Sequence, residues 1–255
     1  MPSTNHLTIF HPLFLNTPML PSEKQLLESV CHFGHRKEKW NPKMAPYLYG
    51  VRRGIHIFDL TKTSQSLKKV CEHMKKFQME GKTILFISTK QQSIPMLESI
   101  ARKLSQPMVT KKWIPGLLTN WSTIKRRLKY YLDLQRSFQT GEIEKYTKKE
   151  QTSLRKKLAK LDTALAGVSK MTGLPDAVFV VDAILDRVAV LEAAKLKIPL
   201  FGICDSNADP DCFTAFIPAN DDAVKSLSLI LSTIENELLD ASSKKAPVDE
   251  ELVAA

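Results

Sequence analysis

Two segments of the chain concentrate side chains that can bind phosphate groups. Residues 36–53 hold six Lys or Arg against one acidic residue, and residues 111–160 hold fourteen against four, so their net charges are +5 and +10. The whole chain of 255 residues has a net charge of +10, so the remaining residues sum to −5. Trp40, Trp113 and Trp121 accompany the two segments. Segregated positive charge beside aromatic residues is typical of a surface that binds a polyanion, and nucleic acid is the commonest one.

A group of carboxylates defines the alternative that the protein is an enzyme. Asp182, Asp205, Asp209 and Asp211 lie where we expect strands to end, and open α/β sheets bind ligands at the carboxyl ends of their strands. Carboxylates there could bind Mg²⁺ and a phosphate ester. The sequence lacks the motifs G-x-G-x-x-G and G-x-S-x-G, so dinucleotide and serine-hydrolase chemistry have no support. We therefore predict no catalytic residues.

The cysteines indicate neither a disulfide framework nor a metal centre. Cys31, His32 and His35 lie close together, but Cys204 and Cys212 are far from them and eight residues apart. A structural zinc site needs four ligands in paired clusters. We therefore predict free thiols in a reducing compartment, and neither a metal nor another cofactor.

The composition indicates an ordered protein with one sizeable core. Hydrophobic residues make up 43% of the chain, and no apolar run approaches the ~18 residues that cross a bilayer. Residues 1–20 contain no Lys or Arg, unlike a secretory signal or a transit peptide. We expect them to form a poorly ordered extension.

Hydrophobic periodicity alternates between strands and helices. Near-continuous apolar runs, typical of buried parallel strands, occupy residues 55–60, 83–88, 108–110, 177–182 and 199–204. Apolar residues at three- and four-residue steps predict helices over residues 22–32, 61–80, 91–104, 184–197 and 220–239. Repeated strand–helix–strand order predicts a three-layer α/β domain with right-handed crossovers.

One stretch departs from this alternation and predicts a protruding antiparallel helical hairpin. Two apolar stripes, one from Ile124 to Tyr131 and one from Leu154 to Leu165, are separated by a polar turn at Gly141. The hairpin should bury little beyond its own leucine seam, with Lys and Arg outside. The predicted division is an extension (1–20), an α/β body (21–119 and 167–240), the hairpin (120–166) and a flexible tail (241–255).

A series of motifs covers residues 22–240 in order and resembles one known family. The motifs are HFGHRKEKWNPKMAPY at 32–47, GIHI at 54–57, KKWIPGLLTNW at 111–121, GLPD at 173–176, DSNADPD at 205–211 and IPANDDA at 217–223. Together they are similar to the bacterial-type small-subunit ribosomal protein S-two family. One departure lies in the segment with Ile114 and Pro115 before Gly116, because the family usually reads WLGGMLTNW and this chain has lost one of the two glycines to proline. Proline fixes a backbone angle and lacks an N–H, so the path of this loop is uncertain from the sequence.

The resemblance implies a fold, a function and partners. It implies a flavodoxin-like parallel sheet with a protruding helical hairpin and no catalytic activity. It implies binding to small-subunit rRNA between head and body, beside neighbouring small-subunit proteins that include the large mRNA-binding one, with no membrane or small-molecule substrate. Several motifs are similar to plastid members, so we expect the plastid (chloroplast) stroma, with the mitochondrial matrix or a bacterial cytoplasm as alternatives.

The expected rRNA contacts come from the two basic segments. They are Arg36, Lys37, Lys39, Trp40, Lys43, Arg52, Arg53, Lys111, Lys112, Trp113, Asn120, Trp121, Lys125, Arg126, Arg127, Lys129, Arg155, Lys156 and Lys157. A general RNA-binding protein that acts outside the ribosome is the alternative function with the same surface chemistry.

Overall fold

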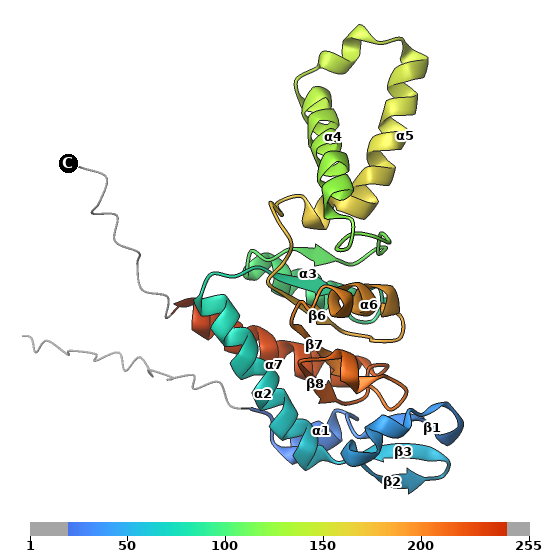
Figure 1. Ribbon diagram of the computed structural model, residues 1–255, viewed down its shortest axis with the longest axis vertical. Helices are drawn as coiled ribbons and strands as arrows, with labels where there is room; N and C mark the ends of the chain where they lie inside the picture. The colour runs from blue at the N-terminus through green and yellow to red at the C-terminus, as the bar shows by residue number, and fades with distance from the viewer. Residues whose placement is uncertain (1–19, 244–255) are drawn as a thin grey trace, which may run out of the picture.

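The centre of the protein is a five-stranded parallel sheet with the order β5-β4-β6-β7-β8 (Figure 1). Its strands are β4 (Ile84–Ile87), β5 (Met108–Val109), β6 (Ala177–Val180), β7 (Leu200–Cys204) and β8 (Ala215–Pro218). Numbered within this sheet the order is 2-1-3-4-5, which is the flavodoxin-like order, so the predicted fold class is confirmed. The computed structural model describes residues 20–243. The predicted extension, apart from Leu20, and the tail beyond residue 243 therefore lie outside the described residues.

Helices cover both faces of this sheet. The helices α2 (Leu60–Met79), α3 (Ile94–Lys103) and α7 (Val224–Ser243) pack on one face, against Phe86, Phe179 and other strand residues. On the other face α6 (Arg187–Lys195) packs against strand residues that alternate with these. Because successive strand residues point to opposite faces and both faces are covered, these strands appear in the sequence as continuous apolar runs. No helix in the described part of the chain is long and apolar enough to span a membrane.

A second, antiparallel sheet has the order β1-β3-β2 and follows the short helix α1 (Glu23–Glu28). Its strands are β1 (Phe33–Arg36), β2 (Leu48–Arg52) and β3 (Ile55–Phe58). The prediction that residues 55–60 form a strand of the parallel sheet is therefore wrong. An apolar run of this length indicates burial but not direction, and its partner strands carry little apolar pattern. The strand β8 was not predicted either.

The predicted hairpin consists of α4 (Trp121–Gln139) and α5 (Lys148–Leu165), which project from one end of the molecule (Figure 1). The helix α4 ends before Gly141, whose φ of +76° is readily adopted only by glycine. The helix α5 begins with a capping box between Thr147 and Glu150. The hairpin connects β5 to β6, where a single crossover helix would suffice.

The base of the hairpin belongs to the core of the body. Ile124, Leu128, Tyr131 and Leu165 share one apolar cluster with strand residues such as Val178. The helix α6 cannot cover this face of the sheet alone, so the hairpin base fills the remaining area. The expectation that the hairpin buries little beyond its own seam is therefore wrong at its base, and the division into body and hairpin stays a prediction.

Candidate nucleic-acid interface

The outer surface of the hairpin carries exposed basic side chains. Helix α4 contributes Lys125, Arg126, Arg127 and Lys129, and helix α5 contributes Arg155, Lys156 and Lys157. None of these seven forms an ion pair with another residue between 20 and 243. A solvated helix surface is usually balanced by acidic residues at three- and four-residue spacing. This surface lacks that balance and is suited to bind phosphate groups.

Contacts between the two helices hold this basic surface in place. The Tyr131 hydroxyl on α4 donates to Asp162 Oδ1 on α5 over 2.7 Å, and burial, together with this carboxylate, raises the pKa of Tyr131 to about 12. The Lys157 ammonium lies 4.6 Å from the centre of the Tyr130 ring. These contacts tie the two helices to each other along part of their length.

The loop before α4 is anchored by a buried carboxylate on α6. Glu192 accepts hydrogen bonds from the backbone amides of Gly116, Leu118 and Thr119, over 2.7 to 3.1 Å. Its Oε1 also accepts from the indole N–H of Trp113 over 3.0 Å. Burial alone would raise the pKa of Glu192, but these hydrogen bonds together lower it. The loop therefore has one defined path despite Pro115.

Lys111 and Lys112 at the start of this loop are exposed, whereas Trp113 is only 8% exposed. Its ring packs in the core and its N–H is bound to Glu192, so the geometry does not support the prediction that Trp113 contacts RNA. Asn120 is exposed at the start of α4, and the partly buried Trp121 packs against the same core.

The N-terminal basic residues form a separate surface on the three-stranded sheet, at the opposite end of the molecule from the hairpin (Figure 1). Arg36, Lys37, Lys39, Arg52 and Arg53 are all exposed. The structure therefore does not join the two basic segments into a single patch. An RNA that touched both would have to extend along the molecule.

Two candidates of the N-terminal segment have protein partners. Trp40 is 37% exposed and its ring stacks on that of His56, with centroids 4.9 Å apart, so one side of the indole is already covered. Lys43 forms ion pairs with Asp209 and Asp211, over 2.9 and 2.6 Å. Because the acidic loop neutralises it, the prediction that Lys43 binds phosphate is not supported by its geometry.

Lys90 occupies the carboxyl edge of the parallel sheet. If the protein were an enzyme, its ligand would be expected at this edge. The Lys90 ammonium lies 2.9 Å from Asp182, 2.7 Å from Asp221 and 2.7 Å from Asp222. Burial alone would lower the pKa of Lys90. The neighbouring carboxylates have the larger, opposite effect and raise this pKa above its usual value, so the side chain stays charged. Asp182, Asp221 and Asp222 therefore bind a side chain of the protein itself at the position where a ligand was expected.

The remaining carboxylate at this edge bonds to the first basic motif. Asp205 Oδ1 lies 3.0 Å from His35 Nδ1, and this carboxylate raises the pKa of His35. The backbone amide of His35 also donates to the Ser206 hydroxyl over 2.8 Å. Within residues 20–243 no group of three or more His, Cys, Asp or Glu could hold a metal ion.

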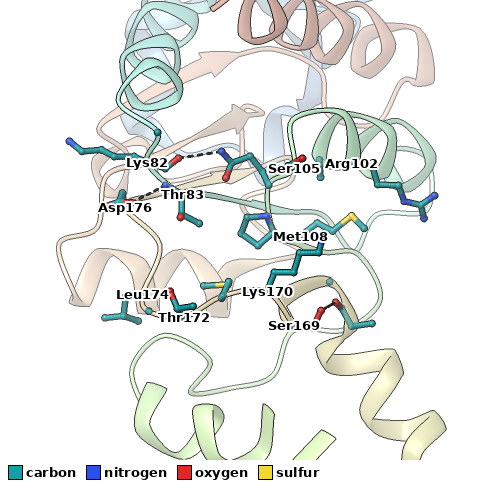
Figure 2. Close-up of a pocket in the computed structure, with 18 residues that line it drawn as sticks. Lys82, Thr83, Arg102, Ser105, Met108, Ser169, Lys170, Thr172, Leu174 and Asp176 are labelled. Atoms are coloured by element: carbon teal, nitrogen blue, oxygen red, sulfur yellow. Dashed lines mark hydrogen bonds between the residues drawn. The ribbon is translucent and has the colours of Figure 1, made fainter. Parts of the chain in front are cut away.

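A cavity of about 580 Å³ lies at the opposite, amino edge of the parallel sheet. Figure 2 shows Lys82 and Arg102 at its two sides, with their charged ends pointing outwards. Its hydrogen bonds are structural, such as that from the Thr83 amide to Asp176 Oδ2 over 2.8 Å. The cavity therefore contains no arrangement of a nucleophile and a base.

The motif series and the geometry agree with a comparison to known families. The family profile described as Ribosomal protein S2 matches residues 26–241. The chain belongs to the ribosomal protein S2 family. The S2 family consists of structural ribosomal proteins, so the prediction that this protein is not an enzyme is confirmed.

Relatives in the S2 family are similar over most of the chain. The small ribosomal subunit protein uS2c of Guillardia theta is 42% identical over 218 residues, covering 86% of this chain and 93% of that protein. The small ribosomal subunit protein uS2 of Fusobacterium nucleatum subsp. nucleatum is 41% identical over 222 residues, covering 87% and 90%. That of Petrotoga mobilis is 42% identical over 219 residues, covering 86% and 76%.

Sequence reasoning missed the two residues that organise this S2 structure, Glu192 and Lys90. Glu192 is a single acidic residue within the apolar segment VAVLEAA, which is a detectable sign of a buried carboxylate. Lys90 follows a buried strand and has no comparable local sign.

Proposed function

We propose that this protein is a structural constituent of the small ribosomal subunit and binds small-subunit rRNA. The observation that carries the proposal is the hairpin, whose exposed cations form no ion pair among the described residues and whose base is anchored in the core. Backbone phosphates are the anions that such a surface fits, and structured RNA would be recognised by its shape. The large contribution of phosphate contacts makes the binding dependent on salt.

The proposed contact residues are the exposed candidates that form no ion pair within residues 20–243. They are Arg36, Lys37, Lys39, Arg52, Arg53, Lys111, Lys112, Asn120, Lys125, Arg126, Arg127, Lys129, Arg155, Lys156 and Lys157. Trp40 and Trp121 remain candidates through their partly exposed rings. Following the family resemblance, we place the protein between head and body, next to the large mRNA-binding protein.

A surface for neighbouring small-subunit proteins is available on α6. Ile184, Leu185, Val188 and Leu191 are each about half exposed, at 47 to 56%. Their spacing puts them on one side of the helix and of the turn before it. Large exposed apolar patches usually mark contact sites for other proteins.

The plastid stroma is the compartment that we propose. The motifs resemble plastid members and uS2c of Guillardia theta is one relative, while two bacterial relatives have nearly the same identity. The mitochondrial matrix and a bacterial cytoplasm are the alternatives. Mass analysis of purified plastid ribosomes decides between them.

A triple variant tests the hairpin contact. Replacing Lys125, Arg126 and Arg127 with Gln should lower the slope of log affinity against log salt by roughly 2, because three phosphate contacts are lost. At a fixed moderate salt concentration, affinity for small-subunit rRNA should fall by about tenfold or more. Binding of the purified full chain to an rRNA transcript, titrated at several salt concentrations, measures both quantities.

A second triple variant controls for net charge. Lys68, Lys69 and Lys76 are exposed on α2, away from the hairpin, and their replacement with Gln removes the same charge. We expect the control to bind nearly as the wild type does. An unchanged slope in the hairpin variant would contradict the proposed contact.

A further inference from the structure

The three-stranded sheet has an inner face that packs on the body and an outer face that does not. On β3, His56 and Phe58 are buried, and Phe58 packs with Met44 and other residues of a third apolar cluster. Ile55 and Ile57 alternate with these residues and therefore point to the outer face, where both are partly exposed.

The strand register places three further side chains on this outer face. Ile55 is paired with Arg36 of β1 on one side and with Arg52 of β2 on the other, and Ile57 is paired with Phe33 of β1. Directly opposite residues project to the same face of a sheet. Phe33 is 39% exposed, and both arginines are exposed. We name Phe33, Arg36, Arg52, Ile55 and Ile57 the arginine-flanked face.

The turn beside this face holds an arginine in an unfavourable backbone conformation. Arg53 and Gly54 connect the paired residues Arg52 and Ile55, and their φ angles are +52° and +78°. A two-residue hairpin turn with two positive φ angles favours Asn-Gly, because Asn adopts the left-handed region more easily than Arg. The turn places one more exposed cation, Arg53, at the edge of the arginine-flanked face.

The cations around this face form no ion pair with any residue between 20 and 243. The Lys37 amide donates to the Gly54 carbonyl over 3.0 Å, so Lys37 is held beside the turn that carries Arg53. Within the described residues 20–243, no ion pair is formed by Lys37 or Arg53, and none is formed by Arg36 or Arg52. A bound polyanion would supply the negative charge that these exposed cations lack among the described residues.

We propose that the arginine-flanked face and its turn bind the minor-groove side of a double-stranded segment of small-subunit rRNA, independently of the hairpin. The minor groove of an RNA duplex is wide and shallow, displays riboses, and is bordered by phosphates. The central strip of Phe33, Ile55 and Ile57 contacts riboses, and the guanidinium groups of Arg36, Arg52 and Arg53 bind the bordering phosphates. This inference rests on the proposed function and adds the kind of RNA and the part of it that is bound.

The Arg53→Asn variant tests the inference through two effects of opposite sign. Asn relieves the strained turn, so the melting temperature should rise by about 2–4 °C. Loss of one phosphate contact should lower the salt slope by about 1 and weaken rRNA binding about fivefold at moderate salt. Thermal unfolding and rRNA titration of the full chain measure the two effects.

Lys197→Asn is the matched control. Lys197 is exposed after α6, has a φ of +55° and leads into the amino end of β7, whereas the three-stranded sheet packs at the carboxyl edge. This variant removes the same charge from the same backbone conformation. It should also gain stability but should bind rRNA as the wild type does. An equal loss of affinity in both variants would overturn the inference, because affinity would then follow net charge alone.

Phe33→Ser tests the apolar strip, and it should weaken rRNA binding without changing the salt slope. The hairpin triple variant in the same titration separates the inference from the proposed function. If the hairpin variant lowers the slope while Arg53→Asn binds like the wild type, only the inference fails. If the wild type shows no salt-dependent rRNA binding, the proposed function fails. The Arg53→Asn variant could also bind free rRNA like the wild type and yet fail to associate with small subunits. That result would show that the face binds a neighbouring protein, and it would overturn the inference.

Discussion

We expect the Lys90→Met variant to lose about 3–5 kcal/mol of unfolding free energy near neutral pH, the largest loss of any single substitution considered for this protein. Lys90 is 8% exposed, and its ammonium group is the cation between Asp182, Asp221 and Asp222. Methionine has a similar length but no charge, so two buried carboxylates would lose their partner. Denaturant unfolding followed by circular dichroism measures the loss.

The loss should be smaller in acid. Burial and the neighbouring carboxylates Asp182 and Asp205 raise the pKa of Asp221 to about 7, while Lys90 lowers it. A carboxyl group whose pKa is higher in the folded state stabilises the fold below its unfolded pKa of about 3.9, and this contribution is lost as pH rises through the folded value. Removing Lys90 raises the folded pKa of Asp221 further. The variant should therefore recover stability as the pH falls from about 8 to about 5, where Asp221 binds a proton.

Lys103→Met is the matched control for this variant. Lys103 is exposed and pairs with Glu235 at the surface, so its loss should change the unfolding free energy by no more than about 1 kcal/mol. Equal unfolding of Lys90→Met and wild type near neutral pH would contradict this account, because it would show that the carboxylates at this edge do not need Lys90.

The second large effect should follow from Glu192→Ala. The substitution leaves the amides of Gly116, Leu118 and Thr119 and the indole N–H of Trp113 without their acceptor. Unsatisfied buried donors cost about 1–3 kcal/mol each when water cannot reach them. Because the loop can partly move into water, we expect a total loss of about 3 kcal/mol.

The loop itself provides a local readout. Lys111 and Lys112 precede the anchored residues, so trypsin should cleave the variant there much faster than the wild type. Glu72→Ala on the exposed side of α2 is the control and should change neither stability nor cleavage. Because hydrogen bonds lower the pKa of Glu192, its contribution is present above the unfolded pKa and is lost as pH falls through the folded value. Wild type and variant should thus converge in acid, and parallel pH profiles would contradict this role.

The parts of the structure that were predictable depend on local patterns. The strands of the parallel sheet are buried on both faces, so residues such as Phe86 and Phe179 appear within continuous apolar runs. The helices α4 and α5 carry apolar stripes with helical spacing, and the polar turn at Gly141 separates them. The charge imbalance of the two basic segments is likewise a property of the sequence alone.

The parts that were not predictable depend on contacts between distant residues. Lys90 contacts Asp182 and Asp221, which lie 92 and 131 residues further along the chain, and only the strand order brings them to one edge. Trp113 was expected to face RNA because basic residues precede it, yet Glu192, 79 residues away, binds its N–H. Pairing in the three-stranded sheet also escaped prediction, since short strands with exposed residues carry a weak pattern.

Sedimentation with intact small subunits is the measurement that tests the central claim most directly. The full chain, mixed with small subunits that lack it and washed in high salt, should sediment with them, because a ribosomal constituent is held by several surfaces whose contributions combine. The hairpin triple variant should be released at a lower salt concentration than the control triple variant on α2. Complete release of the wild type in the same wash, with free rRNA binding intact, would contradict the structural role and favour an RNA-binding protein that acts outside the ribosome.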